Sequence, residues 1–323
     1  MAQRLKRIVQ ICIPVLLGLF LIIEVFLRKH YGFCNDVLYK EDPDYEYIIV
    51  PNQKVFRIGK KIEYNSLSMR SSEIDTNSLT VKILGFGDSV INCGVIIDQD
   101  SLATTLLSNS LSKDGKRKLQ FLNISAKSWG PDNCYQYLLK HGNFGAKAIF
   151  LFVNSPDAHD TMTFQKIVGI DIDHLNKQYN LAIAEFFDRY IVTRVKNYFR
   201  KDEQPTGINS ITTGPQNYSD DKYFNGGFMS FLKYSRQTNI PLYLYLHADR
   251  AECIDRTYSN EGKEIIQFAQ VNNINIIKGI DAGLDSSDYV DFIHIKESGQ
   301  RKIAQAVLDN ILQNPTIYKW PFD

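Results

Sequence analysis

Apolar residues along this chain occur in three arrangements. Residues 8–27 form a continuous run, five short runs follow between residues 81 and 280, and the stretch 28–80 keeps no regular period. Short, nearly continuous apolar runs are typical of strands that are covered on both faces. The predicted strands are residues 81–87, 118–125, 146–154, 241–248 and 274–280.

Segments of helical period lie between and after these strands. They are residues 102–111, 133–142, 226–238, 259–272 and 298–313. Alternation of strand and helix favours a parallel sheet with helices on both faces, because each parallel connection must cross over the sheet. The sequence therefore predicts an α/β fold: a three-layer α/β/α sandwich with a flavodoxin-like parallel sheet of about five strands, preceded by one N-terminal transmembrane helix.

The same pattern divides the chain into three parts. Residues 1–29 contain the long apolar run, and residues 30–80 are predicted to be a linker and lead-in segment with short strands. Residues 81–314 form the main domain. A polar and aromatic insertion at about 155–225, predicted to be helical around 179–199, separates its third and fourth strands and is suited to a lid or a partner surface.

The run at residues 8–27 is long enough to cross a membrane once. Its twenty residues span about 30 Å as a helix, which is the thickness of a hydrocarbon core. A cleaved signal peptide is the alternative, but residues 28–36 offer no small-x-small cleavage site, and Phe33 before Cys34 departs from a lipobox. We expect an uncleaved membrane anchor. A slight excess of basic residues before the run favours a cytoplasmic N-terminus and an extracytoplasmic, periplasmic main domain.

Composition excludes several classes of protein. Hydrophobic residues make up 44% of the chain and charged residues 23%, which is typical of a globular domain with a full core. The 37 lysines and arginines balance 36 acidic residues and are scattered, so nucleic acid is not an expected partner. The five cysteines form no CxxC pair and no zinc-type cluster with histidine, so no metal is expected, and their disulfide state stays open.

A serine emerges where the first predicted strand ends. The chain reads GFGDS over residues 85–89, and open parallel sheets place their sites at the carboxyl ends of strands. The glycines permit a tight turn, after which backbone N–H groups can face a developing oxyanion. A GxGxxG fingerprint would need glycine at Val90, and a GxSxG elbow would need it at Ile91. Neither a dinucleotide fold nor an ordinary α/β-hydrolase is supported.

A carboxylate and a histidine lie near the other end of the chain. Asp291 precedes His294 by three residues, so one turn can bring both side chains to the same side. Asp291 can then hold the imidazole through Nδ1 and leave Nε2 to take a serine proton. Taken alone, Ser89 is a turn or capping serine and His294 a polar turn residue. The combination of the two blocks carries the catalytic interpretation.

The order of these blocks resembles the SGNH (GDSL) hydrolases. GDS follows the first strand, a glycine follows the second, and DxxH precedes the last helix, over a range from about residue 83 to 312. The resemblance implies acyl-enzyme chemistry that needs no cofactor. Its implied catalytic residues are Ser89 as nucleophile, Asp291 as orienting carboxylate, and His294 as general base and acid.

The resemblance also implies an oxyanion hole. Gly130, in the second block, would add its backbone N–H to that of Ser89. The third block departs from the family pattern GxND, because this chain reads NSPD over residues 154–157 and Pro156 has no side-chain donor. We expect Asn154 to supply the amide instead. Loss of one such donor costs about 3 kcal/mol of transition-state stabilisation.

A second resemblance bears on the substrate. Residues 65–73 read NSLSMRSSE and resemble the NxxGxRxxE lead-in of membrane-anchored bacterial SGNH proteins of polysaccharide loci, with Ser68 in place of the glycine. The implied function is a serine esterase that removes or transfers O-acetyl groups on an extracytoplasmic carbohydrate. Hydrolase and O-acyltransferase both stay open. The alternative, indicated by Pro156, is a catalytically idle SGNH-like domain that binds glycan or scaffolds a polysaccharide assembly complex.

Overall fold

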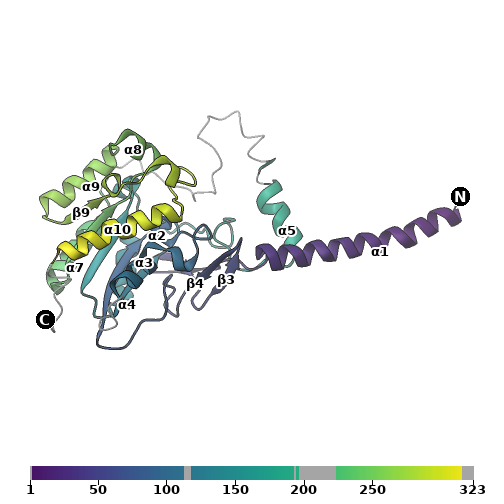
Figure 1. The fold of residues 1–323 in the computed structure, drawn as a ribbon, viewed down its shortest axis with the longest axis horizontal. Helices are drawn as coiled ribbons and strands as arrows, with labels where there is room; N and C mark the ends of the chain where they lie inside the picture. Colours follow the sequence, from purple (N-terminus) through teal and green to yellow (C-terminus); the bar gives the residue numbers. More distant parts are fainter. Residues whose placement is uncertain (1, 113–117, 193, 196–222, 315–323) are drawn as a thin grey trace.

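The structure, a computed structural model, has a long N-terminal helix that projects from an α/β domain (Figure 1). It describes residues 2–112, 118–192, 194–195 and 223–314. Helix α1 (Ala2–Phe26) continues as a π-helical turn, η1 (Leu27–Tyr31). By length and composition, the segment Lys6–Tyr31 is able to span a membrane, and only 6% of its apolar window is buried against the protein.

Five parallel strands form the sheet of the main domain and confirm the predicted fold class. They are β5 (Thr80–Gly87), β6 (Lys118–Ser125), β7 (Ala148–Val153), β8 (Leu242–Leu246) and β9 (Asn275–Lys278). Their spatial order, β6-β5-β7-β8-β9, is flavodoxin-like. Every residue of β7 and β8 is buried, which explains why their sequences are apolar without alternation.

Helices follow the strands close to the positions that the periodicity predicts. They are α2 (Ser89–Asn92), α3 (Ala103–Leu111), α4 (Pro131–His141), α7 (Gly226–Thr238), α8 (Arg250–Asp255), α9 (Asn260–Val271) and α10 (Glu297–Gln313), with short 3-10 turns at η2 (Gln99–Ser101), η3 (Ser155–Ala158), η5 (Gly279–Ala282) and η6 (Ser286–Asp288). On one side of the sheet α3 contacts α10, and elsewhere α4 contacts α7.

The direction of the connections places these helices on opposite faces. The connection from β5 to β6 runs one way across the sheet, and those from β7 to β8 and β9 run the other way. Because parallel crossovers are right-handed, α3 covers one face and α7 and α9 the other. The direction switches between β5 and β7, and open parallel sheets bind ligands at the carboxyl ends of strands at such a point.

The lead-in segment packs onto the domain instead of linking it loosely to the anchor. It forms two antiparallel hairpins, β1 (Tyr39–Asp42) with β2 (Glu46–Ile49) and β3 (Lys54–Arg57) with β4 (Lys60–Glu63). Short strands were expected here. However, Tyr45, Ile49 and Ile62 are buried in the same hydrophobic cluster as the central sheet.

The insertion after β7 contains a short helix within the range predicted to be helical. Helix α5 (Ala182–Phe186) continues as the π-helical segment η4 (Phe187–Val192). The remaining part of the insertion at residues 196–222 lies outside the described residues. The described part of the insertion also contacts the lead-in, since the N–H of Tyr39 donates to the carbonyl of Leu175 at 2.7 Å.

Candidate active site

Ser89 follows the end of β5, the strand beside which the direction of the connections switches. A side chain at Gly87 would place its Cβ 2.9 Å from the carbonyl oxygen of Phe152, so the close approach of β7 requires glycine there. Asp88 caps the short helix α2, and its Oδ1 accepts from the N–H of Val90 at 2.8 Å. Ser89 is the first residue of α2, where backbone N–H groups have no partner inside the helix.

Asp291 folds the DxxH segment into a compact turn. Its Oδ1 accepts from the backbone N–H of Ile293 at 2.9 Å and of His294 at 2.7 Å. This leaves Oδ2 for the imidazole, 2.8 Å from Nδ1 of His294. Burial opposes the charge on Asp291, but the hydrogen bonds from His294 and from the backbone hold the pKa of this carboxyl below its usual range.

The structure brings Ser89, Asp291 and His294 together, although 205 positions separate the serine from the histidine. Nε2 of His294 lies 2.9 Å from Oγ of Ser89. The carboxylate of Asp291 accepts from Nδ1–H, which leaves Nε2 as the acceptor for the serine hydroxyl. The side chains of His294 and Asp291 are only 7% and 9% exposed, so their contact is shielded from solvent.

His247 holds the turn that contains Asp291 and His294 through a backbone hydrogen bond. This histidine follows β8, is fully buried, and its Nε2 donates to the carbonyl of Ile293 at 2.9 Å. Burial lowers the pKa of His247 to about 4, so the ring is neutral at ordinary pH. From the sequence, His247 is a polar loop residue at the same edge of the sheet as Ser89. Its position after the fourth strand was the only signal of a role beside His294.

The two donors expected for the oxyanion, the backbone N–H of Gly130 and the side-chain amide of Asn154, have acceptors within the protein. The N–H of Gly130 donates to Oδ1 of Asn133 at 2.9 Å, and Nδ2 of Asn154 donates to Oδ2 of Asp88 at 2.8 Å. Among the described residues, Oδ1 of Asn154 is buried without a hydrogen-bond partner. An amide has a second N–H, so the bond to Asp88 leaves Asn154 one donor.

Carboxyl groups gather on this side of the site. Burial raises the pKa of Asp88 to about 6, and burial together with neighbouring carboxylates raises that of Asp160 to about 7. Burial and the charge of Asp88 also raise the pKa of Asp157. In the part of the chain that the structure describes, no His, Cys, Asp and Glu side chains are grouped to hold a metal ion. While they are ionised, these carboxyl groups repel any further negative charge beside them, and protonation removes the repulsion.

The NSLSMRSSE segment braces the chain just after α2. Arg70 is fully buried and donates to the carbonyls of Asn92 and Gly94, and to that of Ile97 at 2.7 Å. Ser68 has φ = 62°, a left-handed conformation that favours the glycine found here in the resembled pattern. The segment thus holds the last residue of α2 and the loop that follows it.

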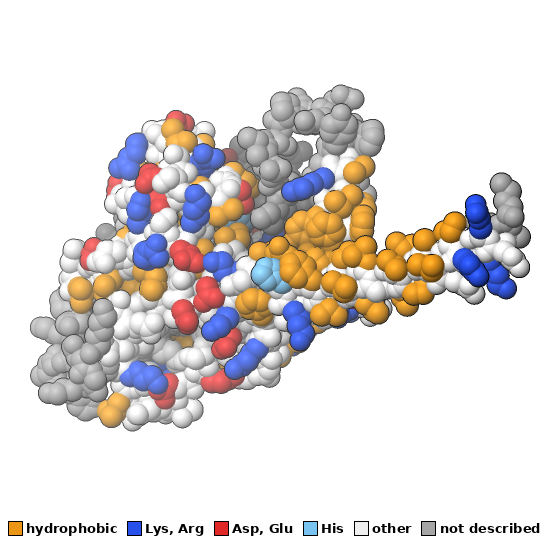
Figure 2. All heavy atoms as spheres, turned by 45° about the vertical axis from the view of Figure 1, so that its right-hand side comes forward, with side chains coloured by type: hydrophobic (Ala, Val, Ile, Leu, Met, Phe, Trp, Pro, Cys, Tyr) orange, Lys and Arg blue, Asp and Glu red, His pale blue; other side chains and the backbone are white. Residues whose placement is uncertain are grey.

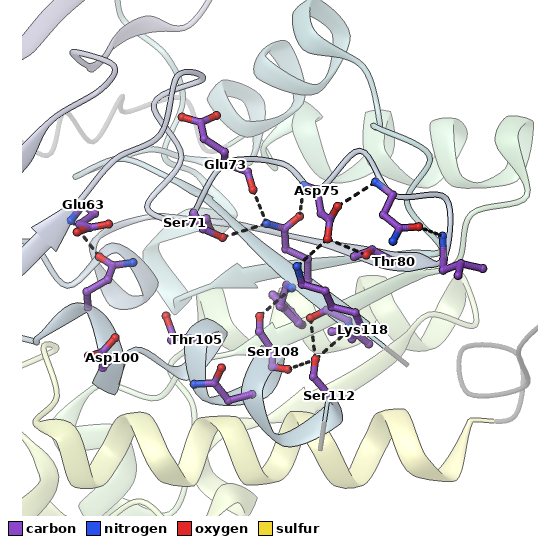
Figure 3. A pocket seen from close by; sticks show the side chains of 18 residues that line it. Glu63, Ser71, Glu73, Asp75, Thr80, Asp100, Thr105, Ser108, Ser112 and Lys118 are labelled. Carbon is purple, nitrogen blue, oxygen red and sulfur yellow. Dashed lines mark hydrogen bonds and ion pairs between the residues drawn. The ribbon is translucent and has the colours of Figure 1, made fainter. Parts of the chain in front are cut away.

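A separate polar groove lies at the opposite edge of the sheet. It encloses about 980 Å³ and is lined by the start of β5 and β6, by α3, and by part of the lead-in (Figure 3). Thr80 and Lys118 begin β5 and β6, whereas Ser89 follows the end of β5. In Figure 3 Asp75 points toward both, and it accepts from Lys118 at 2.7 Å and Thr80 at 2.9 Å. These side chains partner one another, far from the Ser89 turn.

Solved structures with a similar fold were found by comparison. One is a member of the lipolytic G-D-S-L family from Veillonella parvula, at 12% identity and a TM-score of 0.37, covering 72% of this chain and 100% of that one. Another is an acetylxylan esterase from Geobacillus stearothermophilus, at 12% identity and a TM-score of 0.42, covering 71% and 93%. The chain resembles the SGNH (GDSL) hydrolases.

A third similar structure is a lipase/acylhydrolase from Enterococcus faecalis, at 12% identity and a TM-score of 0.40, covering 72% of this chain and 95% of that one. No family model matches the sequence, and no curated protein matches it. At these identities and scores the likeness concerns the fold, so activity and substrate depend on the geometry around Ser89.

Proposed function

We propose that this chain is a membrane-anchored serine esterase of the SGNH type. The observation that carries the proposal is the continuous contact from Ser89 Oγ to His294 Nε2 at 2.9 Å and from His294 Nδ1 to Asp291 Oδ2 at 2.8 Å. A nucleophile, a base and an orienting carboxylate in hydrogen-bond sequence are the arrangement that activates a serine hydroxyl.

In the proposed reaction, Ser89 Oγ attacks the carbonyl carbon of an ester while Nε2 of His294 takes the hydroxyl proton. Asp291 stabilises the imidazolium through Nδ1. The tetrahedral intermediate collapses, the alcohol leaves with the proton from His294, and an acyl group remains on Ser89. Water or a sugar hydroxyl then attacks the acyl-enzyme with His294 as base, and Ser89 is regenerated.

The N–H of Ser89 and a donor from Gly130 or Asn154 are proposed to hold the oxyanion. For Gly130 to do so, its N–H must leave Oδ1 of Asn133, whereas Asn154 retains one amide hydrogen beside its bond to Asp88. Hydrogen bonds at active sites often reach their catalytic alignment only when substrate binds. Each such donor is worth about 3 kcal/mol of transition-state stabilisation.

The proposed substrates are O-acetyl groups on an extracytoplasmic carbohydrate. The resemblance of residues 65–73 to the lead-in of polysaccharide-locus proteins supports this substrate class, and the slight basic excess before the apolar run supports the extracytoplasmic location. Helix α1 would attach the domain to the membrane. Hydrolysis and transfer of the acetyl group both stay open as the outcome of the reaction.

A second candidate is a catalytically idle glycan-binding or scaffolding domain of a polysaccharide assembly complex. The observation that favours it is the engagement of both Gly130 and Asn154 by partners inside the protein. An oxyanion hole that stays closed would leave a well-aligned serine without sufficient stabilisation of the tetrahedral intermediate.

The two candidates are separated by reaction of the detergent-solubilised full chain with a fluorophosphonate probe. We expect covalent labelling of the wild type and none of Ser89→Ala, with acetate released from an acetylated oligosaccharide by the wild type alone. An unlabelled wild type that releases no acetate supports the idle domain and refutes the esterase. With isotopically labelled acetyl donor, counting the label in acetate and in acceptor glycan separates hydrolysis from transfer.

A further inference from the structure

The helix formed by α5 and η4 buries a charged side chain and exposes large apolar ones. Glu185 is fully buried, and its carboxylate accepts from Arg57 at 2.5 Å and from the N–H of Cys34 at 2.6 Å. Its outward side carries Phe187, Ile191 and Val192, which are 54%, 37% and 38% exposed, and one exposed acidic residue, Asp188, which accepts from the hydroxyl of Tyr179. Surface helices of water-soluble domains bury the apolar side and expose the charged side.

This helix is fixed to the base of α1 by a buried carboxylate. Glu24 is 7% exposed, although the apolar residues around it in α1 are exposed. Its two oxygens accept from the N–H groups of Ala182 at 2.8 Å and Ile183 at 3.0 Å, at the start of α5. A carboxylate suits this position because the first N–H groups of a helix lack partners and carry partial positive charge.

Arg28 adds two further hydrogen bonds where α1 meets the start of α5. It donates to Glu24 at 2.7 Å and to the carbonyl of Asn180 at 2.6 Å. Arg189 in η4 pairs with Asp36 of the lead-in, so the charged side of the helix is held from the other direction too. These ion pairs orient the helix with its apolar side away from the protein.

The apolar side of this helix is continuous with the apolar surface of α1. Figure 1 shows α5 running across the end of α1 rather than alongside it. Figure 2 shows exposed hydrophobic side chains along α1 and on the helix beside its base, without a charged belt between the two. If α1 crosses a bilayer, a helix that crosses its end lies along the surface of that bilayer.

We propose that α5 and η4 form an interfacial helix whose outward face, Phe187, Ile191 and Val192, enters the lipid of the same membrane that α1 spans. Apolar faces of such helices insert at the boundary between headgroups and acyl chains. The domain is then held by a span and a surface contact, which fixes the orientation of the Ser89 edge relative to the membrane. The inference rests on the proposed membrane span and not on the proposed catalysis.

The test uses the full chain reconstituted in phosphatidylcholine vesicles, with and without bromine on the acyl chains. Phe187→Trp places a fluorophore on the proposed lipid face, and Ile191→Trp is a second probe of that face. Leu19→Trp, in the middle of α1, reports the span, and Val271→Trp, exposed at the end of α9, reports water. The two native tryptophans are common to all variants and are subtracted with the wild type.

We expect the emission of Phe187→Trp and Ile191→Trp to shift to the blue and to be quenched by brominated lipid, as for Leu19→Trp, while Val271→Trp is unaffected. Quenching of Leu19→Trp without quenching at 187 and 191 overturns the interfacial helix and leaves the span. Absence of quenching at all positions overturns both. A blue shift at 187 that grows with protein concentration and ignores bromine assigns the face to a second copy of the chain and overturns the lipid assignment. Ester hydrolysis does not enter these measurements.

Discussion

The two sides of Ser89 are built differently. On the imidazole side, Asp291 accepts from two backbone N–H groups and from Nδ1, and Nε2 of His294 remains for the serine hydroxyl. On the side proposed to hold the oxyanion, Gly130 and Asn154 already donate to side chains of the protein. The structure thus has a hydrogen-bonded chain from Ser89 to Asp291, whereas the donors proposed for the oxyanion are already engaged.

The difference follows from how far apart in the sequence the interacting residues lie. The imidazole side is made within one turn, because a carboxylate three residues before a histidine can bond both the backbone and the ring. The side proposed to hold the oxyanion joins β5, α4 and the end of β7, and its donors are engaged by the carboxylate of Asp88 and the side-chain amide of Asn133. Burial also raises the pKa of Asp88 to about 6, so the charge that holds Asn154 depends on pH.

The largest effect is expected from removing the base. His294→Ala should lower kcat for ester hydrolysis by a factor of about 10⁶, since the nucleophile and the base of a serine triad act as one unit. Steady-state hydrolysis of an acetyl ester by the full chain measures this, with His141→Ala as the matched histidine control. Comparable rates in both variants would contradict a role for His294 in proton transfer.

Asp291→Asn should have a smaller effect with little change in fold. Its Oδ1 can still accept from the backbone of Ile293 and His294, but the amide no longer stabilises the imidazolium, and we expect kcat to fall by about 10⁴-fold. The thermal unfolding midpoint should stay near that of the wild type. A large fall of the midpoint together with the loss of activity would show that Asp291 is needed for the fold of the turn, and would contradict its role in stabilising the imidazolium.

The oxyanion side is tested by Asn154→Ala. Removing the amide should lower kcat by about 10²-fold with little change in KM, because an oxyanion donor acts mainly in the transition state. Asn272→Ala, at the end of α9, is a control amide away from the site. A loss below about threefold would show that Asn154 only holds Asp88 and is not the oxyanion donor.

Much of the sheet follows from the sequence because strands buried on both faces leave an unambiguous apolar signal. Strands β5 and β6 coincide with their predicted ranges to within one residue, and β7 to β9 are shorter than predicted at their ends. The segment 30–80 was harder, since its four-residue strands are too short to show a period. Its aromatic residues are predicted to belong to a linker, whereas Tyr45 is buried in the core.

The acidic side of the site was not predictable in the same way. Asp88 and Asp157 are 69 positions apart, and their proximity depends on how closely β5 and β7 approach at Gly87. Similarly, the sequence of α5 and η4 has a polar and an apolar side, but periodicity does not say which side faces the protein. Long-range contacts decide both features, so neither the competing acceptors nor the outward apolar side was foreseen.

The smallest expected effect concerns stability and the acidic side. Burial raises the pKa of Asp160 from 3.8 to about 7, so the folded protein holds a proton that the unfolded chain releases at lower pH. Stability therefore falls as pH rises from about 4 to about 7, and the full penalty remains above that range. Asp160→Asn removes the penalty and should raise stability at pH 8 by about 2 kcal/mol after allowance for solvent screening, with little effect near pH 4.

The matched control is Asp171→Asn, whose sign is opposite. Although burial raises it, the hydrogen bond and charge of His174 hold the pKa of Asp171 below its usual range, so this carboxylate stabilises the fold above the ordinary pKa and is lost on acidification. Asp171→Asn should thus destabilise the protein at pH 8 and converge with the wild type in acid. Thermal unfolding of the full chain at pH 4 and pH 8 compares the three proteins. Parallel pH slopes for Asp160→Asn and wild type would show that Asp160 titrates normally, and that the charge crowding beside Ser89 is weaker than its burial implies.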